Sequence, residues 1–335
     1  MTKDRSDKSK SRHHYVQKAY LNGFAVNEKI DVINREDGTV RITQRTSSVA
    51  NERGLYTIQR ENGDKDGILE DIFAEKVESP AIKIIRNMTS VLPYVPRQNE
   101  RQVIAEYMAL QYLRTPEAKR RFEAEAGRFE AIEIFNMAND SKKVGVYLGK
   151  KGEKNDNDSV AAYRDKVIKS LHDNEIIPNS TMWYRQIIKS LPHIADIMTA
   201  RYGWHLLYYD DPVLLTGDHP VILRQIRESW MGTGFMNADE IIFPLNVRYA
   251  LLLSTDFGIK EQVNTNANPS TAKMINWYVK RNSYMEVYSH PSLTSEYAGE
   301  ALGQKILTET TGMDMQEIGF LNNYSGVLLR KKPMR

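Results

Sequence analysis

The hydrophobic periodicity of the chain changes along its length, and this change limits the folds that the sequence can adopt. From Ile68 to about residue 200, apolar residues recur at steps of three and four, as on one face of a helix. The regions on either side contain short apolar runs bounded by Asp, Gly and Pro, which is typical of strands. This order of elements favours an α+β fold, with an N-terminal hairpin and a helical middle packed on a mainly antiparallel C-terminal sheet.

Individual elements follow from the same pattern. We expect a short helix or turn at 14–25, a hairpin at 30–42 around Asp37-Gly38 and a short strand at 55–58. A helix at 68–88 should kink or restart at Ser79-Pro80. Further helices are predicted at 97–113, 116–137, 159–172 and 181–200, with a polar loop at 149–158. The C-terminal strands are predicted at 204–209, 213–215, 221–223, 241–243, 249–253 and 284–288, with a helix at 270–281.

Positive charge is concentrated at the two ends of the chain. Residues 1–12 hold five basic and two acidic residues, and the last six residues hold four basic residues and no acid. The remainder has 37 basic and 41 acidic residues, although the whole chain carries a net charge of +3. We therefore expect a flexible basic arm at 1–12, one α+β domain at 13–329 and a basic tail at 330–335. An anionic ligand or nucleic acid is a candidate partner, through the tails or through local contacts.

The composition excludes several classes of site. The chain has no cysteine, which rules out disulfides, zinc–cysteine sites, thiol nucleophiles and iron–sulfur clusters. No apolar run approaches the roughly 20 residues of a membrane span, and no apolar segment follows the charged start as in a signal peptide. The expected location is the cytoplasm, with no membrane partner. The sequence also lacks the nucleotide-binding glycine loops, His-Glu-x-x-His and Gly-x-Ser-x-Gly, so nucleotide-cofactor enzymes and common hydrolases are disfavoured.

Two of the seven histidines, His13 and His14, are adjacent. Neighbouring side chains point in different directions, so such a pair rarely places both rings on one metal ion. One ring could bind a metal or move a proton while the other packs against the fold. The structural alternative is a pair of partly buried rings that anchor the start of the fold, or one anchor beside one exposed ring.

A second candidate segment, residues 216–220, lies between two strand-like runs, where functional groups often gather. Its Asp218 could bind a metal, orient a histidine or act as a base. The alternative is an Asp turn that is fixed by the following Pro220.

A third candidate is the acidic helix face formed by Asp71, Glu75 and Glu78, which are spaced four and three residues apart. This face is either solvated or contributes a carboxylate to a metal site. Arg114 could clamp an anion or pair with these acids.

Several segments resemble a known family. Residues 13–25 read HHYVQKAYLNGFA, and the later segments are Leu55-Tyr56, Asp71 with Glu78, LQYLRTP at 110–116, Trp204, GDHP at 217–220 and FPLN at 243–246. They resemble, in this order, the HHYVPxxYLxxFA opening, a Phe-Tyr pair, paired helical acids, the LQxxRTP segment, a tryptophan, the SDNP turn and the FPLSP strand of the bacterial domain-of-unknown-function family 4238. The resemblance extends from about residue 13 to 255.

The resemblance selects residues without implying an activity. Gln17 replaces the family's proline, which should leave the fold intact, and His219 stands where asparagine is expected, so Asp218 is the better catalytic candidate. The candidate catalytic residues are His13, His14 and Asp218. The candidate substrate-binding residues are Tyr15, Arg114 and Asn246. The candidate ligands of a divalent metal cofactor are His14, Asp218 and Glu78.

Two functions fit these residues. In the first, they converge on one cleft of a metal-assisted or His/Asp-dependent hydrolase, which acts on an anionic, phosphodiester-like substrate such as nucleic acid. In the second, they form a buried polar network that fixes the fold of a non-catalytic binding or regulatory protein, in a bacterial stress response or in phage defence.

Overall fold

The computed structural model describes residues 12–53, 55, 58–59, 65–66, 68–178, 180–226, 232–256, 261–264, 266–303, 305 and 328–331. The chain divides into two compact units. Unit 1 consists of residues 1–117 and 187–306, and unit 2 of residues 118–186 and 307–335. The single domain expected for residues 13–329 is thus subdivided, and every candidate site residue belongs to unit 1.

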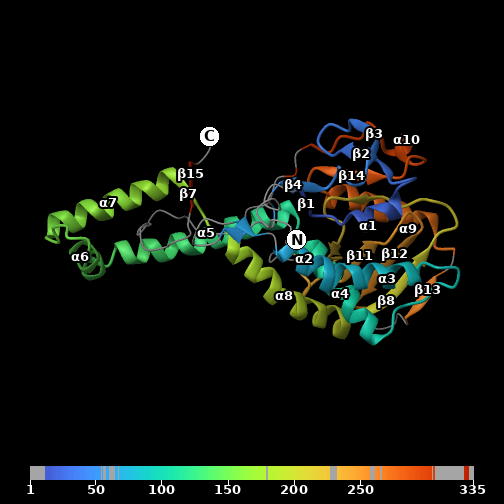
Figure 1. Ribbon diagram of the computed structural model, residues 1–335, viewed down its shortest axis with the longest axis horizontal. Helices are drawn as coiled ribbons and strands as arrows, with labels where there is room; N and C mark the ends of the chain where they lie inside the picture. Colours follow the sequence, from blue (N-terminus) through green and yellow to red (C-terminus); the bar gives the residue numbers. More distant parts are fainter. Residues whose placement is uncertain are drawn as a thin grey trace, which may run out of the picture. The chain divides into compact units, whose positions relative to one another are not determined.

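Two sheets form most of the strand structure of unit 1 (Figure 1). The first has the order β10-β11-β12-β8-β13, in which β13 runs parallel to β8 and the other neighbours are antiparallel. The second is antiparallel, with the order β3-β2-β14-β9. The α+β class with a mainly antiparallel C-terminal sheet is confirmed. The N-terminal hairpin β2-β3 joins this second sheet through β14.

The strands of unit 1 are short. Their bounds are β1 Arg12–His14, β2 Lys29–Asn34, β3 Val40–Arg45, β4 Asn51–Arg53, β5 Ile58–Gln59, β6 Lys65–Asp66, β8 Gly203–Tyr208, β9 Thr216–Gly217, β10 Ile222–Arg224, β11 Glu240–Pro244, β12 Tyr249–Ser254, β13 Gln262–Asn264 and β14 Glu286–Ser289. Most residues of β8, β11 and β12 are buried on both faces, as in a sheet that is covered on both sides. The expected strand at 213–215 is wrong: the amides of Val213 and Leu214 bond instead to the carbonyl of Val247 and lead into β9.

The helical segments of unit 1 are α1 Lys18–Leu21, the 3-10 turn η2 Asn22–Phe24, α2 Ile68–Phe73, the π-helical turn η3 Ala74–Glu78, α3 Ser79–Met88, α4 Gln98–Leu113, α9 Pro269–Asn282 and α10 Thr294–Tyr297. Helices α5 Pro116–Ala138 and α8 Ser180–Arg201 each contribute one end to unit 1. Pro192 lies inside α8. None of the helices among the described residues is both long and apolar enough to cross a membrane.

The helix at 68–88 contains a π turn, and this turn changes which face Glu78 occupies. A π turn takes about one residue more than an α turn, so the side chains after it are rotated relative to those before it. Asp71 and Glu75 remain exposed, whereas Glu78 is buried. The prediction that these three acids share one face is therefore wrong. The predicted break at Ser79-Pro80 coincides with the end of the π turn, where the Ser79 hydroxyl donates to the carbonyl of Ala74 at 2.7 Å.

Residues 13–25 contact both sheets of unit 1. The Tyr20 ring stacks on Phe243 with centroids 5.3 Å apart. Its hydroxyl donates to the carbonyl of Pro244 at 2.7 Å and is hydrogen-bonded to the Thr216 hydroxyl at 2.8 Å. A Cβ atom on Gly23 would lie 3.0 Å from Cβ of Asn246, so this approach favours glycine. Three segments that are far apart in the sequence therefore meet through direct contacts.

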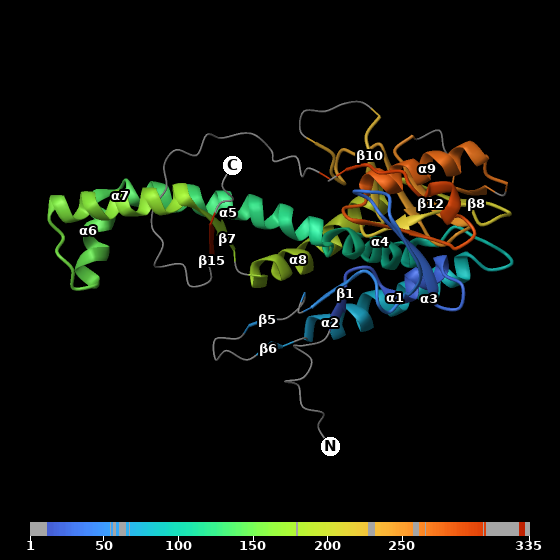
Figure 2. The same ribbon diagram turned by 90° about the horizontal axis from the view of Figure 1, so that it is seen from above.

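Unit 2 is built around the rest of α5, with α6 Ser141–Lys150, α7 Asn157–Asp173, β7 Asn174–Ile177, the start of α8 and β15 Leu328–Lys331. Helices α6 and α7 lie side by side (Figure 2), and Asp140 caps α6 by accepting from the amides of Lys142 and Lys143. Helix α6 was not predicted from the sequence. The unit has its own apolar core, which includes Ile134, Val144 and Leu171.

The ends of the chain differ in part from the expected arm and tail. Arg12 pairs with Arg53 in the β1-β4 ladder, and residues 1–11 lie outside the described residues. Arg330 and Lys331 belong to β15, which pairs with β7, whereas 332–335 lie outside the described residues. The basic residues of the two ends that the structure describes therefore belong to strands.

Candidate functional site

His13 is a buried residue that anchors the N-terminal strand. It sits in β1, its side chain is fully buried, and its Nε2 atom lies 3.3 Å from Oε2 of Glu70 on α2. The adjacent ring points elsewhere, as expected for neighbouring residues in a strand. The pair therefore separates into two environments.

His14 is held at one ring nitrogen. A hydrogen bond from the ring to the backbone of Thr46 favours the protonated form, but burial outweighs it and lowers the pKa of His14 below its usual 6.5, with a further contribution from the charge of Arg114. Nε2 is buried and has no hydrogen-bond partner among the described residues, so the bond to Thr46 engages Nδ1. This arrangement leaves a neutral imidazole whose lone pair lies on Nε2.

A buried ion pair lies beside His14. Arg114 bonds through its guanidinium to Oε1 of Glu78, and its Nε donates to the carbonyl of Tyr15 at 2.8 Å. Both Glu78 and Arg114 act on the charge of His14. Tyr107 of α4 is fully buried near the same pair, and its hydroxyl donates to Gln17 at 3.0 Å. We call His14, Glu78, Tyr107, Arg114 and the Tyr15 carbonyl the His14 cluster.

Arg114 takes the second of its two predicted roles, because it pairs with an acid of the 71–78 segment. A guanidinium committed to a carboxylate and a carbonyl positions the N-terminal strand. Three residues earlier on α4, Gln111 is completely buried, and neither its Oε1 nor its Nε2 has a hydrogen-bond partner among the residues that the structure describes. Unpaired polar atoms therefore occur on both β1 and α4.

Tyr15 links this cluster to a second one. Its carbonyl accepts from Arg114, while its phenol is hydrogen-bonded to Tyr288. Burial raises the pKa of Tyr15, and the negative charges of Asp218 and Glu286 raise it further. The phenol thus lies near Asp218, so the predicted proximity of the N-terminal segment to the 216–220 turn is found at Tyr15.

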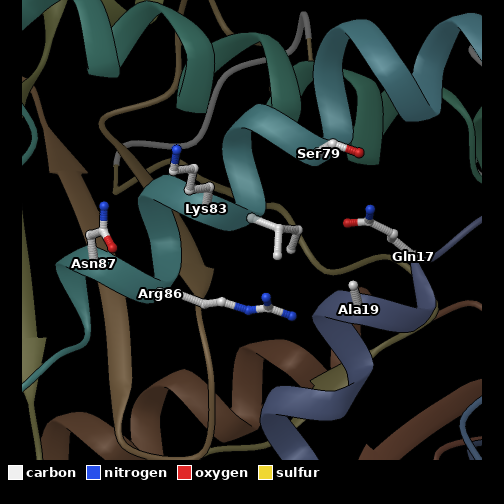
Figure 3. A pocket seen from close by; sticks show the side chains of 7 residues that line it. Gln17, Ala19, Ser79, Lys83, Arg86 and Asn87 are labelled. Carbon is white, nitrogen blue, oxygen red and sulfur yellow. The ribbon is translucent and has the colours of Figure 1, made fainter.

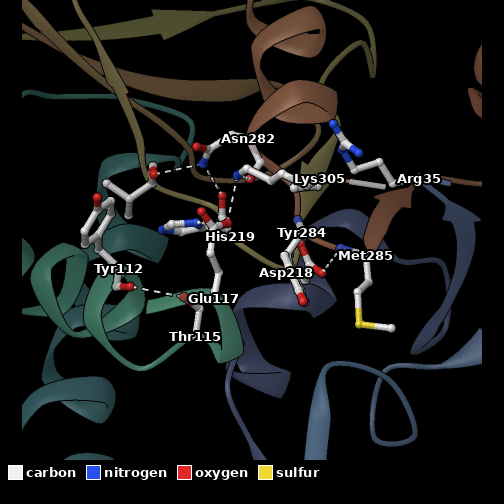
Figure 4. Close-up of polar contacts among 12 residues, drawn as sticks. Arg35, Tyr112, Thr115, Glu117, Asp218, His219, Asn282, Tyr284, Met285 and Lys305 are labelled. Atoms are coloured by element: carbon white, nitrogen blue, oxygen red, sulfur yellow. Dashed lines mark hydrogen bonds and ion pairs between the residues drawn. The ribbon is translucent and has the colours of Figure 1, made fainter. Parts of the chain in front are cut away.

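Asp218 is committed to backbone groups (Figure 4). Its Oδ1 accepts from the amide of Tyr284 at 2.7 Å, and its Oδ2 accepts from the amides of Met285 and Glu286 at 2.6 and 3.0 Å. Burial raises the pKa of Asp218 to about 7, although the amide donors act in the opposite direction. Asp218 therefore fastens the loop before β14 to the turn after β9.

His219 belongs to a buried charged group. Its Nδ1 lies 3.1 Å from Oε2 of Glu117 at the start of α5, and Lys305 donates to the same oxygen at 2.7 Å. Asn282 donates to the His219 carbonyl at 2.6 Å, and Lys305 donates to the Asn282 carbonyl. Figure 4 shows these side chains around Asp218; we call Asp218, Glu117, His219, Asn282 and Lys305 the Asp218 cluster.

The charge of Glu117 is stabilised within this cluster. Burial opposes its ionisation, but the hydrogen bond and charge of His219 and the charge of Lys305 outweigh burial and lower the pKa of Glu117 to about 2. The ring of Tyr112 packs against His219 with centroids 4.8 Å apart. The histidine that replaces the expected asparagine is thus accommodated by a carboxylate and an aromatic ring.

Asn246, a predicted substrate-binding residue, forms a turn. Its Oδ1 accepts from the amides of Arg248 and Tyr249 at 2.8 and 3.0 Å, which closes the connection between β11 and β12. The Gly23 backbone approaches it from the N-terminal segment. These contacts give Asn246 a structural role in the described fold.

The predicted metal ligands His14, Glu78 and Asp218 do not gather into one binding set. In the part of the chain that the structure describes, no three side chains of His, Asp or Glu are placed to hold a metal ion. Glu78 is paired with Arg114, and both oxygens of Asp218 accept backbone bonds. The expected metal site is therefore not formed by these residues.

The sequence did not single out Thr46, Glu70, Glu117 or Lys305 as site residues. Glu117 directly follows the RTP segment, and His219 directly follows Asp218. Their positions next to these motifs could have identified them as candidate site residues. However, no local spacing rule connects residues that are 102 positions apart.

Comparison with curated proteins and with solved structures gave no match. Residues 12–292 match the family described as Protein of unknown function (DUF4238). The matched range contains all the motif segments, and contacts of Tyr15, Tyr20 and Gly23 join the first segment to Arg114, Pro244 and Asn246. The chain is therefore a member of the DUF4238 family of proteins of unknown function.

Proposed function

We propose that this protein is a cytoplasmic hydrolase of anionic, phosphodiester-type substrates in which His14 is the general base. The single observation that carries the proposal is the state of the His14 ring: Nδ1 is held by Thr46, and the buried Nε2 has no partner among the described residues. A half-buried, neutral imidazole with a fixed tautomer has the properties of a base that works near neutral pH.

The chemistry requires few groups. Nε2 of His14 takes a proton from water, the water oxygen bonds to phosphorus, and the ester P–O bond breaks. The imidazolium then returns the proton to the departing alkoxide. The Arg114–Glu78 pair contributes by positioning, since Arg114 fixes the carbonyl of Tyr15 next to His14.

The test is turnover by the full-length protein and by His14→Asn. Asparagine keeps a donor near the Nδ1 position and removes Nε2. Chromogenic phosphodiesters, phosphomonoesters and carboxyl esters are assayed from pH 5 to 9, with and without divalent cations. We expect phosphodiester turnover in the wild type and a loss of about 10²–10⁴ in His14→Asn, which is the usual contribution of a general base. The rate should rise with pH and level off below about pH 6.5, because the neutral ring is the active form.

A matched control is His172→Asn, since His172 is an exposed histidine on α7 in unit 2. This variant should keep the wild-type rate. Full activity in His14→Asn, or no turnover by the wild type under any of these conditions, would sink the proposal.

A non-catalytic binding or regulatory role, as in a stress response or phage defence, is the second candidate. It is favoured by Asp218, whose carboxylate already accepts three backbone amides and has little capacity left for a substrate. The two functions differ in a cellular assay. Protection of cells against phage that persists in His14→Asn would support the binding role, whereas protection that needs His14 would support the enzyme.

A further inference from the structure

A hollow of about 320 Å³ lies between α3 and the start of α1, outside both polar clusters. Gln17 and Ala19 line it on one side, and Ser79, Ile82, Lys83, Arg86 and Asn87 line it on the other. Figure 3 shows the guanidinium of Arg86 extending across the hollow toward Ala19. Its volume is within the range of sites for small organic ligands.

Two cations at this hollow are uncompensated. Within the described part of the chain, neither Lys83 nor Arg86 has an ion-pair or hydrogen-bond partner. Helix α3 contains no acidic residue, and the nearest upstream carboxylate, that of Glu78, is bound to Arg114. By contrast, Lys18 on α1 is paired with Glu28 at 3.0 Å. The hollow therefore has a charge of two positive units without an internal counterion.

Two carboxamides of the lining can also donate to a ligand. Tyr107 donates to Oε1 of Gln17, which fixes the carboxamide and leaves its NH2 group for a ligand. Asn87 carries a second carboxamide, and no carboxylate lines the hollow. Ile82 and Ala19 add an apolar surface. These groups match a ligand that combines an anionic head with an apolar body.

We propose that this hollow binds a small phosphomonoester, with Lys83, Arg86 and Gln17 on the phosphate group and Ile82 and Ala19 against its organic part. A phosphomonoester carries nearly two negative charges near neutral pH, which equals the uncompensated charge of the lining. Its three terminal oxygens can accept from three separate donors, whereas a carboxylate or sulfate ester carries one charge. The site is distinct from the proposed hydrolase centre and does not depend on it.

Helix electrostatics accounts for only part of this arrangement. A cation in the last turn of a helix is stabilised by the helix dipole, and Arg86 has such a position. Lys83 lies in the middle of α3, and the hollow with the fixed Gln17 lies outside the helix. A ligand explains all three features together.

Calorimetric titration of the full-length protein with four probes tests the proposal. Phenyl phosphate and phenyl sulfate have the same shape but differ by about one charge at pH 8. We expect phenyl phosphate to bind at least about tenfold more tightly, with an affinity that falls as salt rises. Inorganic phosphate should bind more weakly than phenyl phosphate, because it leaves the apolar side uncovered. A 12-residue single-stranded oligonucleotide should not exceed the affinity of phenyl phosphate.

The double variant Lys83→Gln/Arg86→Gln changes two exposed side chains and should leave the fold intact, as circular dichroism can verify. It should weaken phenyl phosphate at least tenfold. Lys189→Gln/Lys273→Gln removes the same charge from exposed sites on α8 and α9 and should keep wild-type affinity. His14→Asn should also keep it, which separates this site from the hydrolase.

Three results would overturn the assignment. The first is the absence of phenyl phosphate binding or equal affinity for phenyl sulfate. The second is tighter binding of the oligonucleotide, which would indicate a nucleic-acid surface. The third is an unchanged affinity in the Lys83→Gln/Arg86→Gln variant.

Discussion

The His14 cluster and the Asp218 cluster are both buried polar groups in unit 1, but they satisfy their hydrogen bonds differently. The carboxylate of Asp218 accepts three backbone amides, and Glu117 is shared by His219 and Lys305. In the His14 cluster, Nε2 of His14 has no partner within the described residues. Buried polar atoms that are already paired stabilise a fold, whereas unpaired ones carry a cost that function can explain. The comparison therefore indicates a structural role for the Asp218 carboxylate and is consistent with the proposed role of His14 as a base.

The largest effect should come from Asp218→Ala, which leaves three buried amides without an acceptor. We expect the free energy of unfolding to fall by roughly 3–5 kcal/mol, since each unsatisfied buried group costs about 1–3 kcal/mol and the effects overlap. Asp218→Asn keeps one acceptor oxygen and should lose about half as much. Urea unfolding followed by circular dichroism gives these values. The structural role of Asp218 is wrong if Asp218→Ala is as stable as the wild type but inactive per folded molecule.

An intermediate effect should appear in the pH dependence of stability. The pKa of Glu117 is lowered to about 2 in the folded state, from about 4.5 in the unfolded chain. Its contribution is therefore complete above pH 4.5 and is lost as the pH falls toward 2, with a magnitude on the order of 3 kcal/mol.

Urea midpoints of the wild type and of Glu117→Gln, measured between pH 3 and 6, test this expectation. The wild type should lose its advantage over the variant as the pH falls. A difference that stays constant over this range would show that Glu117 is not ionised and paired as described.

The smallest effect on stability should come from His14→Asn. Asparagine keeps the donor to Thr46 and removes a nitrogen that has no partner in the described structure, so the free energy of unfolding should change by less than about 1 kcal/mol. The same denaturation experiment supplies the value. A loss as large as that of Asp218→Ala would place His14 among the stabilising groups and remove the distinction between the clusters.

Local patterns predicted much of the fold. The change from helical to strand periodicity predicted the α+β class, and the Asp37-Gly38 turn correctly marked the β2-β3 hairpin. The position of Glu78 was not predictable in the same way, because a π turn alters the phase that periodicity assumes. The strand expected at 213–215 failed because its amides bond to a turn and not to a ladder.

The candidate site was predicted only in part. The motif segments led to His14, Tyr15, Arg114 and Asp218, which do lie in two linked clusters. Their partners Thr46, Glu117 and Lys305 could not be predicted from the sequence, because they contact these residues only through tertiary contacts over long sequence distances. The same limit applies to Asn246, since only the structure shows that its side chain closes a turn.

The π turn at Ala74–Glu78 has a consequence for insertions and deletions in this helix. Glu70 meets His13, and Glu78 meets Arg114, which holds Tyr15; both acids therefore serve one short strand segment. In a regular α-helix, eight residues advance the angle by roughly 80° beyond two full turns, and one residue fewer brings it to about 20° from alignment. The extra residue of the π turn thus puts the two acids nearly in line. A one-residue deletion within this turn would therefore return the helix to α geometry and still leave Glu70 and Glu78 about 20° from alignment, whereas a two-residue deletion would move them roughly 120° out of phase, although no contacting side chain is lost.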